Sequence, residues 1–186
     1  ELGIDFLISS ANKCIQGVPG FSFIIARREA LTATQGNART ISLDLHSQWK
    51  TMEKDHGKWR FTSPTHVVAA FAQALKELQQ EGGVTVRGER YAATNRKLRE
   101  GMRALGFEPF VSEAFQGPII TTFLYPEGRN LDFKHMHHWL KEQGYVIYPG
   151  KLTDRDTFRI GNIGEIYDAD ADRILDLFAQ YTKEFM

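Results

Sequence analysis

The sequence is short of cysteine, of net charge and of long apolar runs. Cys14 is the single cysteine, so no disulfide can form within the chain, and we expect a reducing compartment, the cytoplasm. The 23 basic residues are balanced by 23 acidic ones, which gives no support for a nucleic-acid partner. No apolar run approaches the roughly 20 residues that cross a bilayer, so we expect no membrane partner either.

The composition is that of a folded protein. The chain has 186 residues, of which 42% are hydrophobic and 25% charged. This is enough apolar material for a sizeable core in one domain or in one and a half. The chain runs almost at once into a strand-like apolar segment without a starting methionine. We therefore expect it to be part of a larger protein.

Apolar spacing predicts two strands followed by helices up to Gly106, and short strands alternating with helices after it. Strands are expected at 4–8, 21–26, 107–111, 119–125, 145–148 and 157–160. Helices are expected at 43–52, 65–80, 84–105, 132–143 and 168–185. The glycines at 82, 83 and 106 bound the long helix expected at 84–105.

The helix predicted over 84–105 has many charged side chains. We interpret them as a solvated surface, with anion binding as the alternative. They are Arg87, Glu89, Arg90, Arg96, Lys97, Arg99 and Glu100.

Lys13 stands between two predicted strands, in the segment Ser-Ser-Ala-Asn-Lys-Cys-Ile-Gln-Gly-Val-Pro-Gly-Phe, residues 9–21. A lysine between apolar strands is expected to be partly buried, which would lower its pKa and make a neutral amine available. Such an amine can form a Schiff base with a carbonyl. The alternative is a surface lysine in a loop.

Arg159 and Thr62 are the other candidates. Arg159 lies within a predicted strand, where it needs either a structural carboxylate partner or a ligand carboxylate that it can bind bidentately. Thr62, just before Ser63-Pro64, can hydrogen-bond a phosphate oxygen or act as a turn hydroxyl. The triplet His135-x-His137-His138 lacks the further ligands that zinc requires, so we expect no metal site.

The segment 9–21 closely resembles the cofactor-lysine segment of the 2-aminoethylphosphonate–pyruvate transaminase family. Residues 61–66 (Phe-Thr-Ser-Pro-Thr-His) and 158–164 (Phe-Arg-Ile-Gly-Asn-Ile-Gly) agree with it. This family belongs to the fold type I pyridoxal-phosphate (PLP) enzymes, in the class V aminotransferase subgroup. Its members are about twice as long as this chain, so the resemblance implies the C-terminal half of such an enzyme.

The resemblance implies a function and a cofactor. The enzyme would transfer the amino group of 2-aminoethylphosphonate to pyruvate through a Schiff base between Lys13 and PLP, giving phosphonoacetaldehyde and L-alanine. Lys13 would be the catalytic residue, Arg159 would bind the substrate carboxylate, and Thr62 would reach the cofactor phosphate of the neighbouring subunit in a homodimer. The alternatives are an alanine- or serine–glyoxylate-type transaminase of the same subgroup, and a folded module without catalysis.

The same resemblance implies a division of the chain. Residues 1–84 would be the remnant of the large α/β, PLP-binding domain, 85–106 a connecting helix, and 107–186 a small α+β C-terminal domain. The acidic partner of the cofactor ring would lie before Lys13, and Asp5 does not match it. We therefore expect the chain by itself to be inactive.

Overall fold

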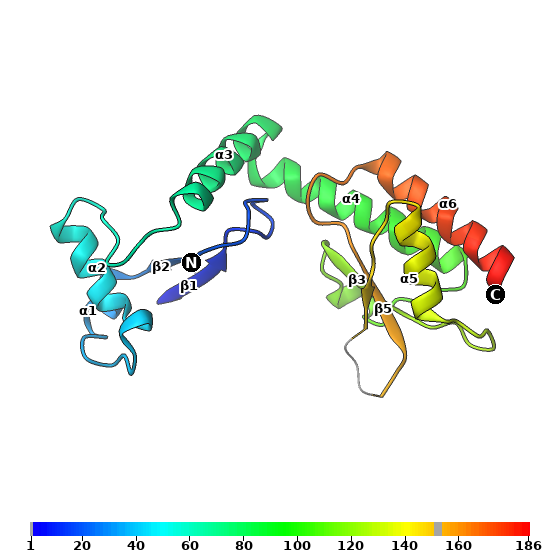
Figure 1. Ribbon diagram of the computed structural model, residues 1–186, viewed down its shortest axis with the longest axis horizontal. Coiled ribbons are helices and arrows are strands. Elements are labelled where there is room, and N and C mark those ends of the chain that lie inside the picture. The colour runs from blue at the N-terminus through cyan, green and yellow to red at the C-terminus, as the bar shows by residue number, and fades with distance from the viewer. Residues whose placement is uncertain (1, 151–153) are drawn as a thin grey trace. The chain divides into compact units, whose positions relative to one another are not determined.

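The computed structural model describes residues 2–150 and 154–186, which form two compact units (Figure 1). The N-terminal unit ends at Glu77, and the C-terminal unit runs from Leu78 to Met186. The helix predicted over 84–105 is part of the C-terminal unit. The assignment of the chain's parts to the large and small domains of an aminotransferase stays a prediction.

The N-terminal unit begins with an antiparallel hairpin of β1 (Phe6–Ser10) and β2 (Ser22–Ala26). The register pairs the first residue of β1 with the last of β2. Both strands were predicted, although β1 starts two residues later than expected. Branched side chains favour the strands, yet Ile8 and Ile25 are 67% and 64% exposed. The hairpin therefore buries only part of its apolar surface within this chain.

Helices follow the hairpin. They are α1 (Arg28–Thr32), α2 (Leu45–Lys54) and α3 (Thr65–Glu81), with a 3₁₀ turn, η1, at Ile41–Leu43. The side chain of Asp44 caps α2 by accepting a hydrogen bond from the Ser47 amide at 2.9 Å. Aromatic rings join the hairpin to α3, because Phe21 lies edge-on to Phe71 at 5.3 Å between centroids.

The C-terminal unit packs helices on a three-stranded sheet. Its helices are α4 (Gly83–Ala104), α5 (Phe133–Glu142) and α6 (Asp168–Phe185), with a 3₁₀ turn, η2, at Glu113–Phe115. The strands are β3 (Ile120–Leu124), β4 (Tyr148–Pro149) and β5 (Thr157–Gly161), in the antiparallel order β3-β5-β4. Helices α4 and α6 run side by side (Figure 1).

The core of this unit is aromatic. Phe158 is fully buried between Phe123 and Phe178, with ring centroids 5.7 and 5.8 Å away. Burying rings of this size is the main stabilising contribution that the hydrophobic effect makes here. Met136 and Leu140 of α5 complete this layer.

The prediction of a strand over 107–111 is wrong. This segment makes only an isolated bridge between Pro109 and Phe123, helped by a hydrogen bond from the Phe110 amide to the Thr122 carbonyl at 2.8 Å. Proline has no amide hydrogen to donate, so the ladder cannot continue through residue 109.

The interpretation of the charged α4 face as solvated is wrong for three arginines. Arg87 and Arg99 are only 3% and 8% exposed, and Arg90 is largely covered. Glu81 bridges Arg87 at 2.6 Å and Arg90 at 2.7 Å, while Arg99 pairs with Glu113. Because each buried cation has a carboxylate partner within reach, the charges can lie against the unit instead of in solvent.

We expect Glu81→Gln to destabilise the protein at neutral pH and to have little effect in acid. Hydrogen bonds from Arg90 and Arg87 hold the pKa of the Glu81 carboxyl below its usual range. A lowered folded-state pKa gives stability that is fully present above the unfolded value, about pH 4.3, and is lost as the pH falls through the folded value.

The measurement is urea unfolding of the complete protein between about pH 3 and pH 7. Loss of charge-assisted hydrogen bonds at a partly screened site should cost about 1–2 kcal/mol at pH 7. The difference between the wild type and the variant should shrink below about pH 4. Glu89→Gln, at an exposed position of α4, is the control. A difference between Glu81→Gln and the wild type that stays constant over this range would contradict the expectation.

Candidate functional site

Lys13 lies in the turn between β1 and β2. Its carbonyl accepts a hydrogen bond from the Gln16 amide at 2.7 Å, and the Gly17 amide donates to the Ala11 carbonyl at 2.9 Å. Gln16 has a φ of 66°, in the left-handed region, so the chain reverses sharply just after the lysine. The predicted position of Lys13 between two strands is therefore confirmed.

Small residues fix this turn against the first turns of α3. A Cβ atom on Gly17 would lie 2.7 Å from the Ala11 carbonyl oxygen and 3.0 Å from the Phe71 ring. A Cβ on Gly20 would lie 2.8 Å from a Val67 methyl group. Only glycine permits these approaches. The backbone of the turn that contains Lys13 thus packs against α3, although the Lys13 side chain does not.

The expected partial burial of Lys13 is wrong for this chain, because its side chain is exposed. The packing of the turn is made by Ala11, which is fully buried, and by the two glycines. Among the described residues, the Lys13 amine makes no hydrogen bond or ion pair. The amine is therefore chemically uncommitted, as a nucleophile must be.

Thr62 lies in the extended segment that leads into α3, and it is exposed. The proline at 64 keeps the residue before it out of the helical region, and α3 begins at Thr65. Within the described chain the Thr62 hydroxyl makes no capping or turn hydrogen bond. The hydroxyl remains available to an external oxygen, but no hydrogen bond joins Thr62 to Lys13 among the described residues.

Arg159 lies at the centre of β5, on the face of the sheet opposite the aromatic core. Its neighbours in register are Thr122 of β3 and Tyr148 of β4. Its Nε donates to the Pro149 carbonyl at 3.1 Å, and its Cζ lies 5.9 Å from the centre of the Tyr148 ring.

The structural salt bridge considered for Arg159 does not occur among the described residues. The guanidinium is half-buried and makes a single hydrogen bond to the backbone. Its outer edge therefore keeps the parallel N–H groups that match a carboxylate. Arg159 belongs to the C-terminal unit, whereas Lys13 and Thr62 belong to the N-terminal unit.

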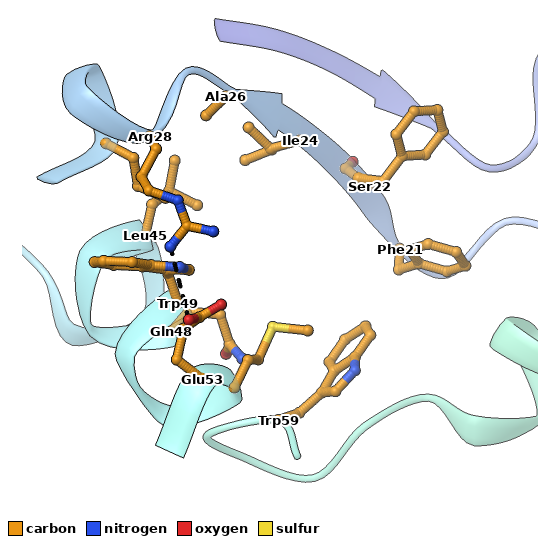
Figure 2. Close-up of a pocket in the computed structure, with 13 residues that line it drawn as sticks. Phe21, Ser22, Ile24, Ala26, Arg28, Leu45, Gln48, Trp49, Glu53 and Trp59 are labelled. Atoms are coloured by element: carbon orange, nitrogen blue, oxygen red, sulfur yellow. Dashed lines mark ion pairs between the residues drawn. The ribbon is translucent and has the colours of Figure 1, made fainter. Parts of the chain in front are cut away.

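A groove of about 570 Å³ lies between β2 and α2 in the N-terminal unit. Figure 2 shows Ile24 of β2 facing Trp49 of α2 across it, with Phe21 and Trp59 nearby. One end is bordered by the ion pair of Arg28 with Glu53 at 3.7 Å. The sequence-based analysis missed this groove, for which the two tryptophans, Trp49 within α2 and Trp59 after it, were the available signal.

None of the predicted site residues lines this groove. Its walls are mostly apolar and aromatic, with the polar side chains of Ser22 and Gln48 and the Arg28–Glu53 ion pair among them. The residues predicted to bind cofactor and substrate lie elsewhere, in the turn of Lys13, before α3 and on β5.

Two other acidic or metal-binding possibilities have structural partners. Asp5 forms an ion pair with Arg27 at 3.2 Å, which agrees with its not serving a cofactor ring. The Nδ1 atom of His135 lies 2.8 Å from the Tyr181 hydroxyl. In the described ranges, no cluster of three potential metal-ligating side chains occurs. None of the helices there combines the length and the apolarity that a membrane span requires.

The fold is that of aminotransferases. Over 99% of its residues the chain matches half of an aspartate aminotransferase of subgroup IV from Thermus thermophilus, with a TM-score of 0.82 and 22% identity. Over 96% of its residues it matches 48% of an alanine–glyoxylate aminotransferase from Nostoc sp., with a TM-score of 0.81 and 22% identity. The predicted fold class, an α/β fold that makes up part of a PLP-dependent transferase, is confirmed, and the chain covers about half of these structures.

Sequence comparison points to one particular kind of aminotransferase. The chain is 62% identical over 177 residues to a 2-aminoethylphosphonate–pyruvate transaminase from Bacteroides fragilis, covering 95% of this chain and 49% of that protein. It is 60% identical over 174 residues to the transaminase of the same name from Klebsiella pneumoniae subsp. pneumoniae, covering 94% and 47%. No protein-family model matches the chain.

The resemblance inferred from the Lys13 segment is therefore confirmed over nearly the whole chain. The chain spans about half the length of these relatives, which fits the predicted C-terminal fragment.

Proposed function

We propose that this chain is part of a PLP-dependent transaminase that transfers the amino group of 2-aminoethylphosphonate to pyruvate, giving phosphonoacetaldehyde and L-alanine. The observation that carries this proposal is the identity of 56–62% to transaminases of that name over about 95% of the chain. Lys13 would be the residue that binds the cofactor covalently. The enzyme would work in the cytoplasm, which suits a chain with one exposed cysteine.

The residues present fit the proposed cofactor. The Lys13 amine is uncommitted, and its turn is held in place by glycine contacts with α3. PLP, when bound, supplies an electron sink for the carbanion formed at the substrate carbon. Lys13 would move the proton between the substrate carbon and the C4′ atom of the cofactor, as general base and acid. A fixed backbone favours this role because proton transfer depends on position.

Arg159 would bind the carboxylate of pyruvate and of alanine. Pyruvate and alanine are the substrate and the product of one half-reaction, and each carries this carboxylate, so a single guanidinium can hold it throughout that half-reaction. Its position on the open face of the sheet, without an acidic partner among the described residues, supports this role. Thr122 and Tyr148, its neighbours in register, would border the bound carboxylate.

Thr62 would hydrogen-bond the cofactor phosphate of a second subunit, which makes the enzyme a homodimer with shared active sites. We expect Thr62→Ala to weaken PLP binding about tenfold, the loss expected from one hydrogen bond to a charged group. Thr62→Ser keeps the hydroxyl and should bind PLP nearly as the wild type does. Equilibrium dialysis of the complete protein measures both, and equal affinity of Thr62→Ala and the wild type would contradict this role.

The activity is tested with the complete protein and PLP. Alanine formation from pyruvate is measured with 2-aminoethylphosphonate or serine as the amino donor. Glycine formation from glyoxylate is measured in parallel with 2-aminoethylphosphonate, alanine or serine as the donor. We expect transfer only with 2-aminoethylphosphonate and pyruvate. Equal or faster transfer to glyoxylate from alanine or serine would favour a related transaminase instead. Absence of any transfer and of any PLP binding would leave a folded module without catalysis.

The chain of 186 residues should be inactive by itself. It spans about half of its relatives, and its Asp5 is paired with Arg27, so a carboxylate for the cofactor ring has to come from elsewhere.

A further inference from the structure

Asn162 occupies a core position at the end of β5. Phe158 and Ile160 point into the core and are 0% and 4% exposed, whereas Arg159 between them lies on the other face. The alternation of a strand therefore places Asn162 in the same inward row, and it is completely buried. An amide in such a place is costly unless all of its hydrogen-bonding groups are satisfied.

The amide of Asn162 makes three hydrogen bonds, which reach two separate parts of the unit. Its Nδ2 donates to the Tyr91 carbonyl of α4 and to the Pro118 carbonyl before β3, both at 3.0 Å. Its Oδ1 accepts from Nδ2 of Asn95, another α4 residue, at 3.1 Å. The side chain thus joins the end of β5 to a helix and to the entry of the neighbouring strand.

Asn95 is held equally tightly. It is 2% exposed, its second Nδ2 hydrogen goes to the Thr121 hydroxyl at 3.0 Å, and its Oδ1 accepts from Arg99 Nε at 2.9 Å. Arg99 is paired in turn with Glu113. Since both amides have partners on each side, neither can rotate or slide without losing several hydrogen bonds at once.

A second contact holds the segment that follows. Arg90 of α4 donates to the Gly164 carbonyl at 2.8 Å and to the Ile166 carbonyl at 3.2 Å, and its guanidinium lies 4.8 Å from the centre of the Tyr167 ring. The chain from Asn162 onward is therefore fixed to α4 by polar contacts. Hydrophobic packing alone would tolerate small shifts along the strand.

We propose that Asn162, with Asn95, is a positioning residue that sets the place of Arg159 along β5. The two residues are three positions apart on one strand, about 10 Å, so a shift at Asn162 moves the guanidinium with it. A displacement of about 1 Å at a binding group can cost about 100-fold in reactivity. This proposal depends on the proposed function of Arg159 in binding a substrate carboxylate.

The test uses Asn162→Ala in the complete protein with PLP. We expect the KM for pyruvate to rise about 10- to 100-fold, while kcat changes by less than about threefold and the PLP absorbance is unchanged. Asn95→Ala removes one of the hydrogen bonds to Asn162 and should give a smaller rise, which keeps the test usable if Asn162→Ala folds poorly.

Leu177→Ala is the matched control, because Leu177 is fully buried in the same unit on α6. It should lower the melting temperature at least as much as Asn162→Ala does, and it should leave the KM for pyruvate within about twofold of the wild type, as expected for lost packing. A KM that rises equally in all three variants, or in none, would overturn the positioning role.

Hydrogen exchange separates this proposal from the proposed function. Asn162→Ala should speed amide exchange in the peptide of β5 by about tenfold relative to Leu177→Ala, as expected for a local opening. If the wild type neither binds PLP nor transfers an amino group, the proposed function fails. Amide exchange in β5 alone then decides whether Asn162 holds this strand in place. Unchanged amide exchange in β5 of Asn162→Ala would overturn this structural role as well.

Discussion

Lys13→Ala should abolish covalent attachment of PLP to the complete protein and reduce transamination by at least about 1,000-fold. The Lys13 amine is proposed to hold the cofactor and to move the proton at the substrate carbon, and loss of a general acid–base group alone costs about 100- to 10,000-fold. Folding should be unaffected, because the side chain is exposed and makes no hydrogen bond or ion pair among the described residues.

Borohydride reduction followed by peptide mass mapping measures attachment directly. The wild type should carry the reduced cofactor on the peptide with Lys13, and Lys13→Ala should carry none. Lys76→Ala, at an exposed position on α3, is the control and should keep both attachment and activity. Reduced cofactor on another lysine of the wild type would show that the assignment of Lys13 is wrong.

Arg159→Leu should raise the KM for pyruvate by about 100- to 1,000-fold. Two hydrogen bonds between a guanidinium and a carboxylate, each contributing about 1.5–3 kcal/mol, account for a loss of this size. Since Arg159 makes one backbone hydrogen bond and no ion pair among the described residues, its loss should change the free energy of unfolding by less than about 1 kcal/mol.

Arg159→Lys separates charge from geometry. Lysine keeps the positive charge but cannot form the parallel pair of bonds, so we expect a KM between those of the wild type and Arg159→Leu. Arg173→Ala, at an exposed position of α6, should have no effect on KM. Substrate saturation curves for pyruvate measure all three variants. An unchanged KM in Arg159→Leu would remove the carboxylate-binding role.

Much of the local structure could be predicted from the sequence. The amphipathic pattern of residues 168–185 gave the bounds of α6 correctly, because a helix that buries one stripe of side chains must repeat every three to four residues. Gly106, with a φ of 91°, follows α4 where the pattern placed the end. The absence of a strand at 107–111 could not be predicted in this way, because it depends on how Pro109 pairs with β3.

The candidate site could be predicted only in part. The segment around Lys13 was sufficient for the resemblance, which the comparisons confirm. The burial of Lys13 was predicted wrongly, because the apolar residues next to it in the sequence do not determine whether any side chain covers the lysine in the fold. The roles of Lys13, Thr62 and Arg159 stay predictions, and the hydrogen bonds of Asn162 were not foreseen from its place after Gly161.

The sequence by itself determined most of the segments that become helices and strands, and it placed a lysine in a turn and an arginine in a strand. These properties depend on residues close to one another along the chain, where periodicity and turn chemistry act. Tertiary structure decided that Lys13 is exposed and that three arginines of α4 are covered and paired with Glu81 or Glu113. It also decided that Arg159 is without an acidic partner among the described residues. The physical reason is that burial and charge pairing depend on contacts between residues far apart in the sequence. The pattern of neighbouring residues does not determine those contacts.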